Sequence, residues 1–183
     1  VFKTEQLQAL TSAQIAGLSS QQLADLSTNT LRSLSTVQMS VLETSDLVAL
    51  SVESLGALQG AQILALLTAQ LTALTSVQLA GLNSAAVNAL STTQLVALSS
   101  TKLNFLDVAS VSGLTSSQVA SLTTTQIVGL STNFLAALDT TTVGGLTTAQ
   151  ITALTTNQAA NLTSATVNAL TTKQIAVLET TDL

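Results

Sequence analysis

A leucine recurs at every eighth position along the chain. From residue 3 to residue 178 these leucines mark 22 complete repeats of eight residues, here called octads, without insertion or deletion. With the leucine as position 8, the consensus is Thr/Ser, Thr/Ser, any residue, Gln, Ile/Leu/Val, any residue, Ala/Gly, Leu. Residues 147–154 (TTAQITAL) show it cleanly. A fixed period of this kind is typical of solenoids, in which each repeat packs against its neighbours.

Three positions of the octad carry apolar or small residues. Position 5 is aliphatic or Met in every complete octad except the one that holds Ala159, and position 7 is Ala, Gly or Ser in 17 of 22. Positions 5 and 8 are three residues apart, which suits one face of a helix and breaks the alternation of a strand. We therefore expect positions 5, 7 and 8 to be buried. Representative core leucines are Leu10, Leu18, Leu74, Leu82, Leu130, Leu154 and Leu170.

A single long helix does not fit this period. Eight helical residues advance by about 800°, so the leucine stripe would drift by about 80° per octad and no partner could follow it. Ser or Thr at position 1 with Gln at position 4 has the spacing of a capping box, and Gln stands at position 4 in 13 of 23 octads, counting the partial last one. The sequence thus predicts one short capped helix per octad, stabilised by packing. The expected capping pairs include Thr11 with Gln14, Thr75 with Gln78, Thr123 with Gln126, and Thr147 with Gln150.

Position 6 suggests a second period. Its four large aliphatic residues, Val48, Leu64, Val96 and Val128, all fall in even-numbered octads. This predicts coils of two octads with one side packed more deeply and, at the usual 8 to 10 Å between helices, a rod of roughly 100 Å. We expect one all-α solenoid over residues 1–183, as part of a longer array. The alternative is a β-solenoid with threonine ladders and stacked glutamines.

Composition excludes several classes of function. Charged residues make up 7% of the chain, the net charge is −5, and His and Cys are absent. Four scattered cations form no basic stripe for nucleic acid, and the apolar runs are too short to span a membrane. Without His or Cys the usual catalytic acids, bases and nucleophiles are missing. We therefore expect no enzyme, no small-molecule substrate and no cofactor.

Two groups of residues depart from the repeat. Glu43, Asp46 and Glu53 could bind a cation weakly if the coils bring them together, although solvated acids of the first helical turn are the interpretation we favour. Phe105 at small position 7 and Phe134 at the glutamine position, together with Phe2 near the start, are candidates for a subunit contact. The alternative is that such phenylalanines fill local gaps.

The phrase LTTAQITAL, residues 146–154, resembles the short tandem repeats of very large secreted bacterial surface proteins. The resemblance implies a fibre, surface-layer or adhesin context outside the cell. A homopolymer, formed end to end or laterally, is the expected assembly, because repeat arrays without polar capping repeats expose an apolar layer at each end. The alternative function is a surface-binding module, for ice through threonine columns or for a host or carbohydrate surface.

Overall fold

The computed structural model describes residues 2–178, and all regular secondary structure in this range is α-helical. This part of the chain holds 22 helices of four to six residues and no strand, which confirms the all-α solenoid and excludes the β-solenoid. The helices are α1 (Thr4–Gln8), α2 (Ser12–Ala16), α3 (Ser20–Ala24), α4 (Thr28–Arg32), α5 (Thr36–Ser40), α6 (Thr44–Ala49), α7 (Val52–Gly56), α8 (Gly60–Ala65), α9 (Thr68–Ala73), α10 (Ser76–Ala80), α11 (Ser84–Ala89), α12 (Thr92–Ala97), α13 (Ser100–Leu103), α14 (Val108–Val111), α15 (Ser116–Ser121), α16 (Thr124–Gly129), α17 (Thr132–Ala136), α18 (Thr140–Val143), α19 (Thr148–Thr152), α20 (Thr156–Ala160), α21 (Ser164–Ala169) and α22 (Thr172–Ile175).

Each helix begins directly after position 1 of its octad and ends before position 8. Around α16, for example, Thr123 has φ −72° and ψ 155° and Leu130 has φ −71° and ψ 143°, both extended. The described residues contain no positive φ and no cis peptide bond. The chain therefore turns through extended residues at positions 8 and 1, without the left-handed residue that ends many helices.

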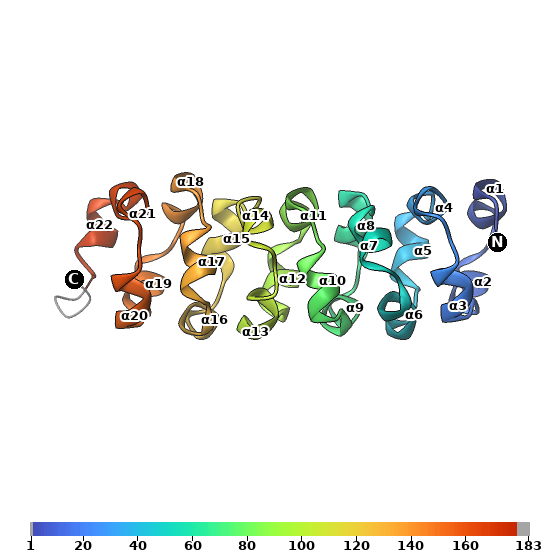
Figure 1. The fold of residues 1–183 in the computed structure, drawn as a ribbon, viewed down its shortest axis with the longest axis horizontal. Coiled ribbons are helices and arrows are strands. Elements are labelled where there is room, and N and C mark those ends of the chain that lie inside the picture. Colours follow the sequence, from blue (N-terminus) through green and yellow to red (C-terminus); the bar gives the residue numbers. More distant parts are fainter. Residues whose placement is uncertain (1, 179–183) are drawn as a thin grey trace.

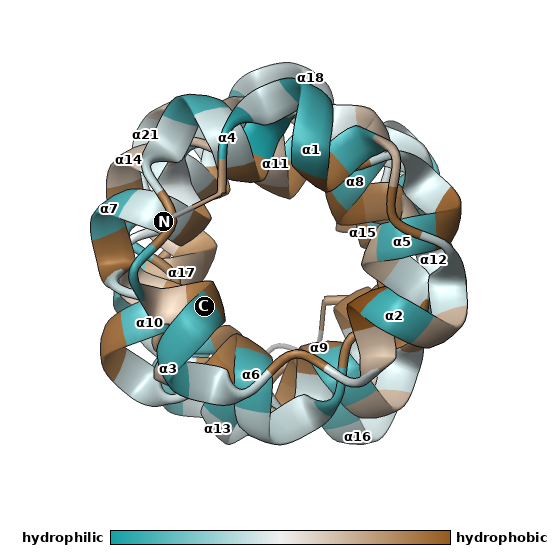
Figure 2. Ribbon diagram, turned by 90° about the vertical axis from the view of Figure 1, so that its right-hand side faces the viewer, coloured by the Kyte–Doolittle hydropathy of each residue, from teal (hydrophilic) through white to brown (hydrophobic). Residues whose placement is uncertain are grey.

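The helices wind into a rod (Figure 1). Each packs mainly against the third helix along the chain, as α3 does with α6 and α5 with α8. Viewed down the rod, helices seven octads apart lie at the same place on the ring: α4, α11 and α18 at the top, α5 and α12 on the right, α7 and α14 on the left (Figure 2). Hydrogen bonds between neighbouring turns join residues 25 to 31 positions apart, so one turn of the rod contains about three and a half octads.

The predicted coil of two octads is wrong. The position-6 side chains of Val48, Leu64, Val96 and Val128 are 40%, 55%, 41% and 49% exposed. The even-numbered octads that contain them therefore do not form a more deeply packed side of the solenoid. The physical reason is that one capped helix with its extended turn redirects the chain by less than a third of a circle rather than by half. About six turns at 8 to 10 Å give a rod of roughly 60 Å instead of roughly 100 Å.

The core consists of positions 4, 5 and 8. Leu74, Leu82, Leu130, Leu154 and Leu170 are buried as expected, and they belong to one continuous cluster along the rod. Leu10 and Leu18 are only half-buried. They lie in the first turn, which has a neighbouring turn on one side only.

Position 7 does not belong to the core, contrary to the prediction. None of its described residues is buried. These residues lie instead where a helix meets the helix three places earlier: a Cβ atom on Gly145 would stand 2.8 Å from Cα of Ser116. Position 7 holds small residues because two backbones approach each other there. A large side chain does not fit at this position, although the position is accessible to solvent.

Candidate functional site

The capping box forms at all four representative pairs. The backbone N–H of Thr11 donates to Oε1 of Gln14 at 2.9 Å, and the N–H of Gln14 donates to Oγ1 of Thr11 at 3.3 Å. The same exchange joins Thr75 with Gln78, Thr123 with Gln126, and Thr147 with Gln150. In these octads the position-1 and position-4 side chains therefore satisfy free amides at the start of their own helix.

The position-4 glutamines also have a second role, which the sequence interpretation missed. Nε2 of Gln94 donates to the carbonyl oxygens of Leu66 at 2.7 Å and Ile63 at 3.0 Å, in the octad four places earlier. Those carbonyls lie at positions 8 and 5, at the end of α8, where backbone donors become scarce. The Ile63 carbonyl also accepts from the Leu66 backbone N–H at 3.2 Å. One buried side chain thus caps the start of its own helix and the end of a helix in the preceding turn.

This bond recurs along the whole rod, and we call the series the glutamine ladder. Every position-4 glutamine that has an octad four places before it donates to the position-8 carbonyl 28 residues earlier, at 2.6–2.9 Å. The ten ladder glutamines are Gln38, Gln62, Gln70, Gln78, Gln94, Gln118, Gln126, Gln150, Gln158 and Gln174. All are buried, and no buried side-chain N or O atom among the described residues lacks a partner.

One sequence signal could have revealed the ladder. Glu serves a capping box as well as Gln does, yet Glu never stands at position 4. Only the amide has a donor for the second helix end. Other donors replace it in places: the Ser110 hydroxyl donates to the Leu82 carbonyl at 2.6 Å, the Thr142 hydroxyl donates to the Leu114 carbonyl at 3.1 Å, and the Lys102 ammonium reaches the Leu74 carbonyl.

The three acidic candidates do not form a cation site. Asp46 is buried and fills position 4, where its carboxylate accepts from the Glu43 backbone N–H at 3.1 Å and from the Ser20 hydroxyl at 2.8 Å. Glu43 and Glu53 are exposed. Over residues 2–178 no three His, Cys, Asp or Glu side chains are grouped to hold a metal ion.

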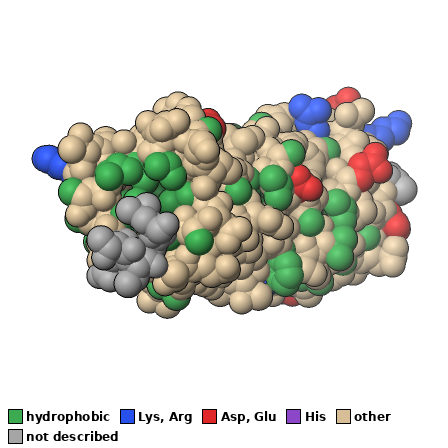
Figure 3. Space-filling view, turned by 60° about the vertical axis from the view of Figure 1, so that its left-hand side comes forward, with side chains coloured by type: hydrophobic (Ala, Val, Ile, Leu, Met, Phe, Trp, Pro, Cys, Tyr) green, Lys and Arg blue, Asp and Glu red, His purple; other side chains and the backbone are tan. Residues whose placement is uncertain are grey.

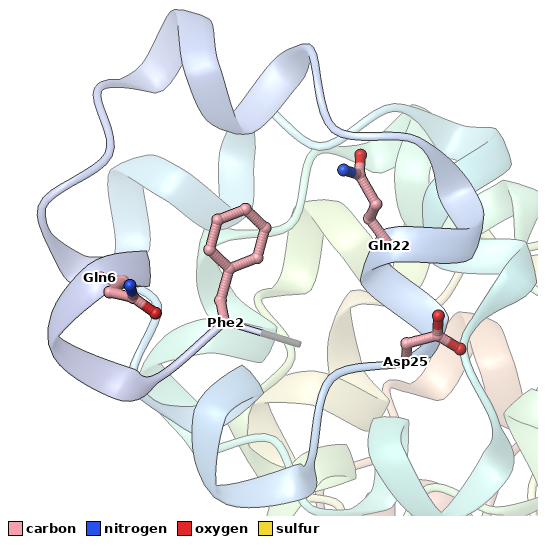
Figure 4. Close-up of a pocket in the computed structure, with 4 residues that line it drawn as sticks. All are labelled: Phe2, Gln6, Gln22 and Asp25. Atoms are coloured by element: carbon pink, nitrogen blue, oxygen red, sulfur yellow. The ribbon is translucent and has the colours of Figure 1, made fainter.

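The three phenylalanines have different surroundings. Phe134 is 3% exposed and lies in the core, so the proposed subunit contact is wrong for this residue; it fills the space of a ladder glutamine. Phe105 is 40% exposed. Phe2 is partly buried and lines a recess at the N-terminal end of the rod together with Gln6, Gln22 and Asp25. Figure 4 shows the Phe2 ring between the side chains of Gln6 and Gln22.

The surface carries few charged side chains. On the face that Figure 3 draws, most of them lie toward the N-terminal end of the rod. The charged residue Asp139 caps α18 and accepts from the Thr142 N–H at 2.7 Å. Hydrogen bonds from Thr142 hold the pKa of the Asp139 carboxyl below its ordinary value of 3.8. None of the helices between residues 2 and 178 has the length and apolar character needed to cross a membrane.

Comparison with known proteins identifies the repeat. The ALTTAQ repeat family matches the chain at residues 39–76, 65–100 and 135–164, which together cover half of its length. No curated protein matches the chain significantly. The name of the family spells six residues of the consensus octad, among them the position-1 threonine of the cap and the position-4 glutamine of the ladder. The chain is a member of the ALTTAQ repeat family.

Proposed function

We propose that this chain is a structural module without catalytic activity, which forms or extends an extracellular filament, surface layer or adhesin stalk by self-association. The glutamine ladder is the observation that carries the proposal. Each ladder glutamine satisfies the helix end left open four octads earlier, as Gln126 does for Leu98 at 2.7 Å. Adding octads therefore lengthens the rod without changing its interior, and length becomes the property that the repeat controls.

The low charge of the rod supports self-association. A net charge of −5 over 183 residues produces little repulsion between copies. Several large apolar side chains remain exposed on the sides, among them Val37 at 61%, Leu64 at 55% and Leu67 at 55%. Secretion to the cell surface remains part of the proposal and rests on the resemblance to large bacterial surface proteins.

Ice binding is the weaker alternative. Hydroxyls at position 1, such as that of Thr75, are used in helix caps. The helices of consecutive octads also lie on different sides of the rod (Figure 2). The threonines of consecutive octads therefore do not form one flat array. Adhesion to a host or carbohydrate surface would require one side of the rod to differ from the others in chemistry.

Electron microscopy of the purified chain at rising concentration tests the proposal, with a thermal hysteresis assay on the same sample. We expect rods that lengthen or bundle with concentration and no depression of the freezing point. Short rods of constant size at every concentration would refute self-association. Thermal hysteresis would favour the ice-binding alternative.

A further inference from the structure

Four large apolar side chains form a line along one side of the rod, which we call the apolar stripe. They are Val37 on α5, Leu64 on α8, Leu67 at the start of α9 and Val96 on α12, and each is between 41% and 61% exposed. Helix α5 packs against α8, and α9 packs against α12. Figure 2 shows α5, α8 and α12 together on the right-hand side of the ring.

The spacing of the stripe follows the turn of the rod. Residues joined by hydrogen bonds between neighbouring turns are 25 to 31 positions apart. Leu64 and Leu67 stand 27 and 30 positions after Val37, and Val96 stands 29 positions after Leu67. Three successive turns therefore present an apolar side chain at the same place around the rod, at the usual 8 to 10 Å between packed helices.

The packing of the rod does not account for Leu67. This leucine stands at position 1, where every other octad has a polar or charged residue. Its side chain makes no cap hydrogen bond to α9 and is 55% exposed. The octad thus loses a side-chain cap without burying apolar surface inside the rod. A contact outside the rod gives this leucine a reason.

No charged residue adjoins the stripe. Residues 54–101 contain none, and the charged residues nearest to Val37 along the chain are Arg32 and Glu43. The residues 25 to 31 positions before and after each stripe residue, which lie on the neighbouring turns, are uncharged as well. A partner can therefore cover the stripe without removing a charge from water.

We propose that the apolar stripe docks against the same stripe of a second copy of this chain, so that two rods lie side by side. A second copy suits this surface because its stripe is equally uncharged and repeats with the same turn, so that apolar side chains meet along the whole contact. Burial of these side chains drives the association. The contact uses the same patch on both partners and joins the rods in pairs. The inference rests on the proposed self-association and specifies its interface.

The variant V37T/L64T/L67T/V96T tests the interface on the full chain. Threonine occurs in other octads at each of the three repeat positions concerned, positions 1, 3 and 6, so the variant stays within the repeat pattern. The Leu67→Thr change also supplies the missing capping hydroxyl of α9. The matched control V48T/V77T/V108T/V128T removes four exposed valines outside the stripe. Circular dichroism establishes that both variants keep the helical fold.

Sedimentation velocity over a concentration series measures association. We expect the wild-type chain and the control to form dimers with the same association constant, and the stripe variant to lose at least about tenfold. Association of the stripe variant equal to that of the wild type, or an equal loss in both variants, would overturn the proposed interface and leave self-association standing. A wild-type chain that stays monomeric at every concentration would overturn both.

Discussion

Nε2 of Gln94 lies 2.7 Å from the carbonyl oxygen of Leu66, 28 residues earlier in the chain, and this bond joins two successive turns of the rod. The same side chain accepts from the Ser91 N–H at 2.8 Å through Oε1. A single glutamine therefore stabilises one helix start and one helix end. Stability should depend on which of its two roles a given glutamine can perform.

Replacing Gln94 with Ala should lower the free energy of unfolding by roughly 2–4 kcal/mol, because a cap and two buried carbonyl bonds are lost together. The matched control is Gln14→Ala, since Gln14 caps its helix but makes no ladder bond. Its cost should be about 1 kcal/mol, the value of a cap alone. Urea unfolding followed by circular dichroism measures both, and equal costs would argue against a stabilising ladder.

Asp46 occupies a position-4 site without making a ladder bond, so a substitution there can restore the missing bond. Its carboxylate cannot donate to the carbonyls of Ile15 and Leu18, which stand 31 and 28 residues earlier. Asp46→Gln should supply that donor and raise the urea midpoint, whereas Asp46→Asn, one methylene shorter, should not reach and should lower it or leave it unchanged. The ladder account would fail here if the glutamine variant were no more stable than the asparagine variant.

Close backbone approach at position 7 predicts a contrast between two glycines. A Cβ on Gly145 would stand 2.6 Å from Cβ and 2.9 Å from the carbonyl oxygen of Ser116, so Gly145→Ala should cost about 1–3 kcal/mol. Gly17 lies in the first turn, and the nearest atom to its added Cβ is a carbonyl oxygen of its own helix at 3.4 Å. Gly17→Ala should be neutral or slightly stabilising, because it reduces the freedom of the unfolded chain. Thermal melts measure the stability of both variants. An equal loss of stability in the two variants would contradict the close backbone approach at Gly145.

The cap of α18 should depend on pH. The pKa of Asp139 is lowered in the folded protein, so its stabilising contribution is complete above the ordinary value of 3.8 and is lost as pH falls through the lower folded pKa. A carbon-13 NMR titration of the Asp139 carboxyl should give a midpoint below 3.8. The Asp139→Asn variant keeps a capping oxygen without titrating, and its stability should change less with acid. A midpoint at or above the ordinary value would contradict the cap geometry.

The octad pattern alone determined the local structure. A leucine at every eighth residue is incompatible with one long straight helix. Thr123 with Gln126 three residues later predicts the start of a helix. Short helices at known positions therefore follow from local geometry. The core assignment of positions 5 and 8 follows for the same reason. These features depend on residues close together in the chain.

Only the tertiary structure decided how the octads stack. The number of octads per turn depends on the angle between successive helices, which extended residues such as Leu130 and Ser131 set through small differences in φ and ψ. The outward direction of Val48, the close approach at Gly145 and the ladder bond from Gln94 to Leu66 all follow from that angle. Because the angle brings together residues 25 to 31 positions apart, an eight-residue pattern that repeats identically cannot specify which octads become neighbours.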